Sequence, residues 1–153
     1  MEKSMRWKLL AGLAVLLLVP CGYAAVRLSM GGKPVERKLT VTGYCKCGEC
    51  CDWRRDWLGV PVCTSARDKG KMKMVGITAS GTVAGHGTIA ADAARYPMGT
   101  MMYVEGYGYG RVEDVGEKIT GDHIDVYFNT HVLAQAWGTK KMRVKIWIPR
   151  NER

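Results

Sequence analysis

The fold of this 153-residue chain is constrained most by a series of short strand-like runs separated by glycine-rich turns. Only residues 130–137 have a helical pattern, with Thr130 as a suitable N-cap and Gly138 as a stop. Many short strands, 19 glycines and one helix predict a mainly β domain, in the form of a small barrel. The expected strands cover residues 38–44, 87–91, 101–104, 110–115, 123–128 and 142–148.

The first 24 residues have the architecture of an export signal. A basic start precedes an apolar run, Leu9–Val19, and Pro20 then ends the helical pattern. We expect cleavage after Ala24. An uncleaved membrane anchor is one alternative, because the uncharged run 9–26 is long enough to span a bilayer, and lipidation at Cys21 is another. All three alternatives place the domain outside the cytoplasm.

The remaining chain divides into three parts. Residues 25–37 contain two adjacent glycines and a proline, which predicts a linker. Residues 38–149 form the expected domain, and residues 150–153 a C-terminal tail. The length fits one domain, which we expect to be a monomer.

The formal charge of +9 favours a polyanionic partner. For an exported chain, the cell wall and anionic lipid head groups are nearer candidates than nucleic acid. We therefore expect no nucleic-acid partner. A solvated basic surface with no partner is the alternative that charge alone leaves open.

The segment 45–73 is irregular and rich in cysteine, and it predicts a long loop with a short helix near residues 52–58. Its five cysteines are Cys45, Cys47, Cys50, Cys51 and Cys63. Export favours structural disulfides across this cluster. A zinc site and free thiols are the alternatives, but the spacing lacks two separated ligand pairs and a paired histidine. A catalytic cysteine would need a histidine base, and the three histidines lie far away in the sequence. We therefore expect no metal and no cofactor.

Two aspartates, Asp114 and Asp125, interrupt segments that otherwise resemble buried strands. Strand alternation places His123, Asp125 and Tyr127 on one face and apolar residues on the other. Asp125 has no local turn to explain it, which favours a function. Asp114 precedes a Val-Gly turn, so a turn role and a functional role are equally supported.

Seven motifs occur in an order and spacing that resemble the three-aspartate (3D) domain of cell-wall lytic enzymes, related to the catalytic domain of membrane-bound lytic transglycosylase A. The motifs are VTGYCKCGECC (41–51), GITASGT (76–82), GTIAAD (87–92), YPMGT (96–100), YVEGYGYGRVEDVG (103–116), GDHIDVYF (121–128) and WGTKKMRVKIW (137–147). The resemblance implies a six-stranded double-psi β-barrel over residues 38–149.

The resemblance maps the three aspartates onto Asp92, Asp114 and Asp125. It implies that Asp125 is the catalytic acid and base, and that Asp114 and Thr78 line the same cleft. For Asp92 a structural hydrogen-bonding role is favoured over catalysis. The chain departs from the family at three positions, with Ala93 for proline, Glu117 for glycine and Thr120 for lysine.

The function implied by the resemblance is that of a murein lytic transglycosylase. Such an enzyme cleaves the β-1,4 bond between N-acetylmuramic acid and N-acetylglucosamine and leaves a 1,6-anhydro product. Candidate catalytic residues are Asp125 and Asp114, and candidate substrate-binding residues are Asp92, Thr78, His123, Tyr127 and Tyr44. The alternatives are a non-catalytic module that binds peptidoglycan glycan strands and an expansin-like protein that loosens glycans on the same barrel.

Overall fold

The computed structural model of the chain describes residues 32–149. The predicted signal segment, the first part of the predicted linker and the C-terminal tail lie outside the described residues. Within residues 32–149, no helix is both long enough and apolar enough to cross a membrane.

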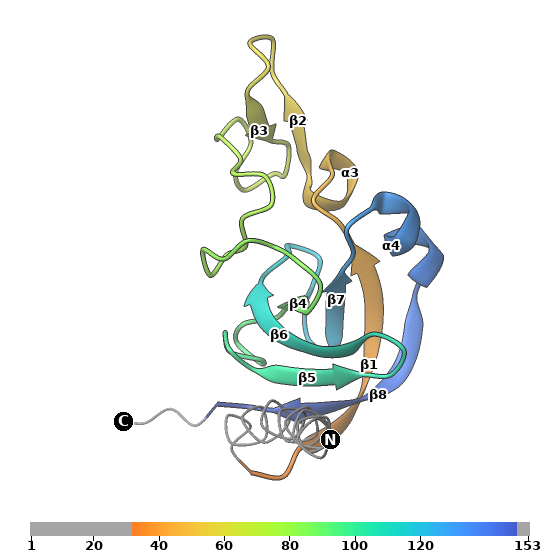
Figure 1. Cartoon of the computed structure of the whole chain (residues 1–153). Helices are drawn as coiled ribbons and strands as arrows, with labels where there is room; N and C mark the ends of the chain where they lie inside the picture. Colours follow the sequence, from red (N-terminus) through yellow and green to blue (C-terminus); the bar gives the residue numbers. More distant parts are fainter. Residues whose placement is uncertain (1–31, 150–153) are drawn as a thin grey trace, which may run out of the picture. The chain divides into compact units, whose positions relative to one another are not determined.

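The domain is a closed barrel of six strands, which confirms the predicted fold class (Figure 1). Going around the barrel, the order is β1-β7-β4-β6-β5-β8, and β8 pairs with β1 to close it. The strands are β1 (Val35–Tyr44), β4 (Thr88–Ala91), β5 (Met101–Val104), β6 (Gly108–Asp114), β7 (His123–Tyr127) and β8 (Lys140–Trp147). The first strand begins at Val35, inside the predicted linker.

Two strand pairs, β1–β7 and β4–β6, are parallel, and the other neighbours are antiparallel. Parallel neighbours need a long connection between them, so each pair joins distant parts of the sequence. β1 ends at Tyr44, whereas β7 begins only at His123, after five other strands. Ala90 of β4 pairs with Asp125 on one side and with Asp114 on the other.

The barrel interior is filled by aliphatic side chains that alternate along the strands with outward-facing residues. In β7, Ile124 and Val126 are fully buried, while His123 and Asp125 are partly exposed. This is the division of faces that the period-2 pattern predicts. The other fully buried aliphatic side chains include Leu39, Val41, Ile89, Met102, Val104, Val112 and Val144.

The cysteine-rich segment differs from its prediction in one respect. The short helix is α3 (Gly48–Cys51), which lies before the predicted range of 52–58. The residues predicted to be helical instead form the first part of a two-stranded hairpin. Its strands are β2 (Trp53–Arg55) and β3 (Pro61–Cys63), and it projects from the barrel in Figure 1. The bend occurs at Asp52, whose φ of 49° ends the helix.

The predicted C-terminal helix is confirmed as α4 (His131–Trp137). The Thr130 hydroxyl accepts a hydrogen bond from the Leu133 amide, and Gly138 ends the helix. The helix packs against β1 at Gly43, where an added Cβ would lie 2.9 Å from the Ala134 carbonyl oxygen. A glycine is therefore needed at this position of β1.

Candidate functional site

A groove of about 570 Å³ lies between the barrel and the cysteine-rich segment. This volume is within the range of small-molecule and cofactor sites. Its walls come from β1, β4, β6 and β7, from α3, from the end of β3, and from the loops that follow β3 and β6. Among the predicted site residues, the lining includes Tyr44, Thr78, Asp114, His123 and Asp125.

Three side chains from the parallel strands β1 and β7 form a hydrogen-bonded chain on one wall of this groove. Thr42 lies opposite Asp125, and its hydroxyl donates to Asp125 Oδ1 at 2.5 Å. His123 Nε2 lies 2.8 Å from the same hydroxyl oxygen. Because the hydroxyl has one proton and gives it to Asp125, the assigned direction makes His123 Nε2 the donor to Thr42.

Asp125 is partly buried, and this burial raises the pKa of its carboxyl above the ordinary value. The hydrogen bond from Thr42 and the nearby His123 act in the opposite direction, but desolvation is the larger effect. Burial, rather than Asp114, is responsible in the structure.

Asp114 lies on the other side of Ala90, so two strand spacings separate its backbone from that of Asp125, about 10 Å. Its Oδ1 accepts from the Ala79 and Val115 amides, each at 3.0 Å, and its Oδ2 accepts from the Tyr44 hydroxyl at 3.2 Å. Asp114 therefore stabilises a turn and also lies in the groove, two alternatives that the sequence had left open.

Tyr44 holds Asp114 in place more than it presents a ring to the groove. Its ring is buried and contacts Tyr127 edge-on, with the centroids 5.4 Å apart. Burial, followed by the nearby Asp114 carboxylate, raises the pKa of the Tyr44 hydroxyl. Tyr127 is also buried and is absent from the lining of the large groove. It packs against Tyr44 and is not placed to contact a ligand in that groove.

The other two predicted substrate-binding residues have structural hydrogen bonds. The buried Thr78 hydroxyl accepts from the Thr82 amide at 3.1 Å, which shapes a loop at the groove edge. Asp92 lies outside the groove lining, and its carboxylate accepts from the Gly121 amide at 2.9 Å and the Ala94 amide at 3.1 Å. These two bonds, that to Gly121 first, lower the pKa of Asp92.

Thr42 is not among the site residues predicted from the sequence. The signal that could have found it is the alternation of β1, which places Thr42 on the same face as Tyr44. Two departures from the family pattern are also located by the structure. Glu117 lines the groove, with its carboxylate 3.9 Å from the Arg67 guanidinium, whereas Thr120 is exposed outside the lining.

The structure corrects one expectation about the cysteines. His131 lies beside them, with its Nδ1 3.4 Å from the sulfur atoms of both Cys47 and Cys50. Among the described residues, Cys45, Cys47, Cys50 and His131 form a cluster that could hold a metal ion. The five described cysteines are all free thiols in this structure, so the predicted disulfides stay a prediction.

The fold and the site together describe a closed six-stranded mixed β-barrel domain with two aspartates, Asp114 and Asp125, in one groove. Residues 87–149 match the model of the 3D domain. This part of the chain is therefore identified as a 3D domain. The match begins after β1 and the cysteine-rich segment, so it covers less of the chain than the predicted range of 38–149.

Two proteins of Bacillus subtilis (strain 168) are similar to part of the chain. YabE, named as a candidate cell wall shaping protein, is 43% identical over 58 residues, which are 38% of this chain and 14% of YabE. The cell wall-binding protein YocH is 41% identical over 58 residues, 38% of this chain and 20% of YocH. The chain thus spans a small part of each of these relatives.

Among solved structures, MltA from E. coli has a TM-score of 0.39 and 22% identity, covering 52% of this chain and 30% of MltA.

Proposed function

We propose that this protein acts on peptidoglycan outside the cytoplasm, as a lytic transglycosylase with Asp125 as its acid and base. The observation that carries this proposal is the partly buried carboxyl of Asp125, which faces a groove and has a pKa raised by burial. A carboxyl that donates a proton near neutral pH needs such a raised pKa. The cell-wall names of the two Bacillus relatives support the substrate class and the location.

In the proposed reaction, protonated Asp125 gives its proton to the glycosidic oxygen as the bond to C1 of the muramic acid breaks. The resulting carboxylate then takes the proton of the C6 hydroxyl of the same sugar, whose oxygen closes the 1,6-anhydro ring on C1. No water is consumed, and Asp125 ends protonated. One carboxyl is enough, which agrees with the separation of Asp114 from Asp125 by two strand spacings.

The hydrogen-bonded chain on the groove wall would orient Asp125 for both steps. Thr42 holds one carboxylate oxygen, and His123 in turn holds the Thr42 hydroxyl. Because one oxygen is occupied by Thr42, the other is the one that would face the sugar. Asp114, on the opposite side of Ala90, would supply a second negative charge to the groove, and this charge would stabilise the positive charge of the transition state.

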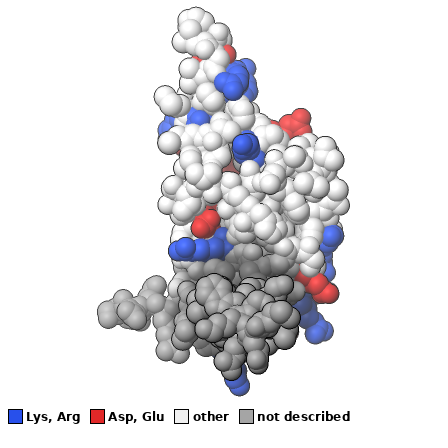
Figure 2. Space-filling view, in the orientation of Figure 1, with Lys and Arg blue, Asp and Glu red and all other residues white. Residues whose placement is uncertain are grey.

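Basic side chains at the groove would contribute to binding. Arg67, Lys73 and Lys118 line it, and their charges complement the carboxylates of peptidoglycan stem peptides. On the face drawn in Figure 2, lysine and arginine are scattered among large uncharged areas.

The second candidate is a non-catalytic module that binds peptidoglycan in the same groove. The observation that favours it is the similarity to YocH, a cell wall-binding protein. A fold by itself does not distinguish binding from catalysis, so an experiment must do so.

The test is digestion of purified peptidoglycan with the wild-type protein, Asp125→Asn and the control Glu105→Gln, which removes an exposed carboxylate on the turn before β6. We expect 1,6-anhydromuropeptides by mass spectrometry from the wild type and the control. Asp125→Asn should bind peptidoglycan in a pull-down but release about 10²- to 10⁴-fold less product, the usual contribution of acid–base catalysis.

The other outcomes separate the alternatives. Binding by folded wild-type protein without any product would support the binding module. Products with reducing ends and added water would indicate a hydrolase. If the folded protein neither binds nor cleaves peptidoglycan, both proposals are wrong.

A further inference from the structure

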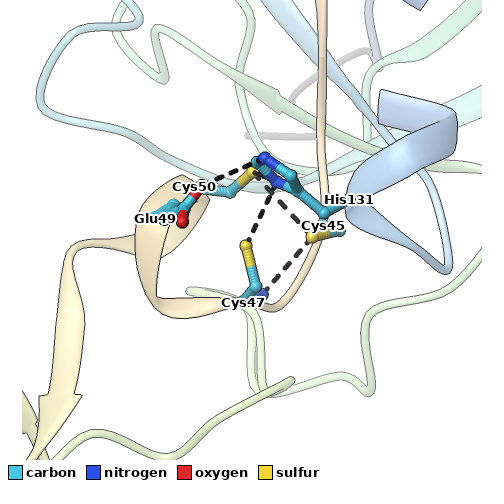
Figure 3. A network of polar contacts seen from close by, with 5 residues as sticks. All are labelled: Cys45, Cys47, Glu49, Cys50 and His131. Atoms are coloured by element: carbon cyan, nitrogen blue, oxygen red, sulfur yellow. Dashed lines mark hydrogen bonds and ion pairs between the residues drawn. The ribbon is translucent and has the colours of Figure 1, made fainter. Parts of the chain in front are cut away.

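The feature that the proposed function does not use is the cluster of Cys45, Cys47, Cys50 and His131 beside the groove (Figure 3). The three cysteines come from the turn between β1 and α3 and from α3 itself, and His131 is the first residue of α4. Their ligand atoms all lie within 4.8 Å of one another. We propose that these four residues form a tetrahedral binding site for a zinc ion.

Three of the six distances between ligand atoms are close to the edges of a tetrahedral zinc site, and the others are within 4.8 Å. Zinc bonds to sulfur at about 2.3 Å and to histidine nitrogen at about 2.0–2.1 Å, so a tetrahedron has sulfur–sulfur edges of about 3.8 Å and sulfur–nitrogen edges of about 3.6 Å. The sulfur atoms of Cys45 and Cys50 lie 3.8 Å apart. His131 Nδ1 lies 3.4 Å from the sulfurs of both Cys47 and Cys50. One ion can therefore contact all four groups.

The orientation of His131 supports the same inference. Its Nδ1 points to the sulfur atoms, and its Nε2 lies 3.0 Å from a carboxylate oxygen of Glu49. A carboxylate on the far nitrogen is the arrangement that fixes the ring tautomer of metal-binding histidines. It places the proton on Nε2 and leaves the lone pair of Nδ1 free for a metal. Glu49 is exposed, so a simple surface ion pair with His131 would contribute little to the stability of the fold.

The donor set identifies the class of metal. Three thiolates and one imidazole in a tetrahedral arrangement suit zinc, and four protein ligands are typical of a structural site rather than a catalytic one. On binding, the three thiols release their protons to solvent as their sulfurs bond to the ion. No oxidant or reductant is needed, unlike in disulfide formation.

The neighbouring cysteine shows how the local fold selects these ligands. Cys51 follows Cys50 directly, but its thiol donates to the Cys45 carbonyl at 3.2 Å and does not belong to the cluster. The Cys47 amide points to the Cys45 sulfur at 3.5 Å, a contact that stabilises a thiolate. The turn therefore aims three of its four cysteines at one point.

The site would join two parts of the groove wall. β1 ends one residue before Cys45 and carries Thr42 and Tyr44. β7 carries His123 and Asp125 and ends shortly before α4, which begins with His131. A zinc ion would clamp the segments that follow these two parallel strands, and so hold the cysteine-rich wall of the groove against the barrel.

The test uses the full chain, purified with a non-chelating reductant, and measures metal by mass spectrometry of the element. We expect one zinc per chain in the wild type and in the matched control Cys51→Ser, whose hydroxyl can still donate to the Cys45 carbonyl. His131→Asn and Cys47→Ser should lose most of the zinc. Glu49→Gln should retain the ligands but weaken zinc about 10- to 100-fold in competition with a chelator.

A second measurement does not depend on the variants folding. Cobalt(II) added to the metal-free wild type should produce the thiolate charge-transfer band and the strong d–d bands of a tetrahedral site. Absence of one-to-one zinc or cobalt uptake by folded protein would overturn the proposal. So would full zinc occupancy in folded His131→Asn, or a disulfide among Cys45, Cys47 and Cys50 in protein isolated without reductant. An iron–sulfur chromophore would overturn the choice of zinc. None of these readouts depends on peptidoglycan cleavage.

Discussion

Thr42 and Asp125 lie directly opposite each other on two parallel strands, and the threonine hydroxyl donates a 2.5 Å hydrogen bond to the carboxylate. The two residues are 83 positions apart in the sequence. The contact exists only because β1 and β7 are neighbours in the closed barrel. It makes Thr42 a positioning residue for the proposed acid and base.

Thr42→Val should lower kcat/KM on peptidoglycan by about 10- to 100-fold, because a hydrogen bond to a charged group contributes about 1.5–3 kcal/mol. The bond lowers the pKa of Asp125, so its loss should raise this pKa further. The alkaline limb of the pH–rate profile should then move to higher pH. Carboxyl NMR titration of Asp125 would show the same direction without any activity.

The control for this change is Thr40→Val, two residues earlier on β1, whose side chain makes no hydrogen bond within residues 32–149. It should change neither the profile nor the titration. An unchanged Asp125 titration in Thr42→Val would contradict the assigned hydrogen bond.

Asp125→Asn should stabilise the protein at neutral pH. Burial raises the pKa of Asp125 in the folded state, so the folded protein loses stability as pH rises from the unfolded pKa, about 3.9, through the folded one. The neutral amide avoids this loss and can still accept from Thr42. Thermal unfolding should show a higher Tm for the variant at pH 7, and the difference should shrink toward pH 3.

The same melts on Glu105→Gln, an exposed carboxylate, should show no such pH-dependent gain. A lower Tm for Asp125→Asn at pH 7 would mean that the charged carboxylate contributes to folding, against the inference from burial.

Asp92→Ala should reduce stability and leave peptidoglycan binding intact, because the Asp92 carboxylate joins two loops outside the groove. Its pKa is lowered by the Gly121 and Ala94 amides. The stabilisation is therefore present above the unfolded pKa of about 3.9 and is lost as pH falls through the folded pKa. Tm should fall at pH 7 and approach the wild-type value in acid. Loss of binding with an unchanged Tm would instead restore Asp92 to the substrate site.

Gly43→Ala should destabilise the fold by about 1–3 kcal/mol, the usual cost of overpacking. An added Cβ would meet the Ala134 carbonyl at 2.9 Å and the Phe128 ring at 3.0 Å, so α4 must move away from β1. Gly85→Ala is the matched control, since a Cβ there meets nothing within 4 Å. Denaturant unfolding of the two variants measures the difference, and equal stabilities would contradict the close packing of α4.

Local patterns in the sequence were enough to identify several elements. Alternation separated Asp125 and His123 from the buried Ile124 and Val126, and Thr130 and Gly138 marked the ends of α4. These features depend on interactions within a few residues, which a single stretch of sequence contains. The short helix was misplaced because four residues are too few for a helical period, and the hairpin at 53–63 has no regular alternation.

The composition of the site was decided by barrel closure. It placed Thr42 opposite Asp125, put Ala90 between Asp125 and Asp114, and left Asp92 outside the groove. It also brought His131 to Cys47 and Cys50, more than 80 positions away. The sequence by itself determined the strands, their faces and the acidic residues, because these follow from local periodicity. Only the tertiary structure determined the partners of each residue, because strand order in a closed barrel depends on contacts between distant segments.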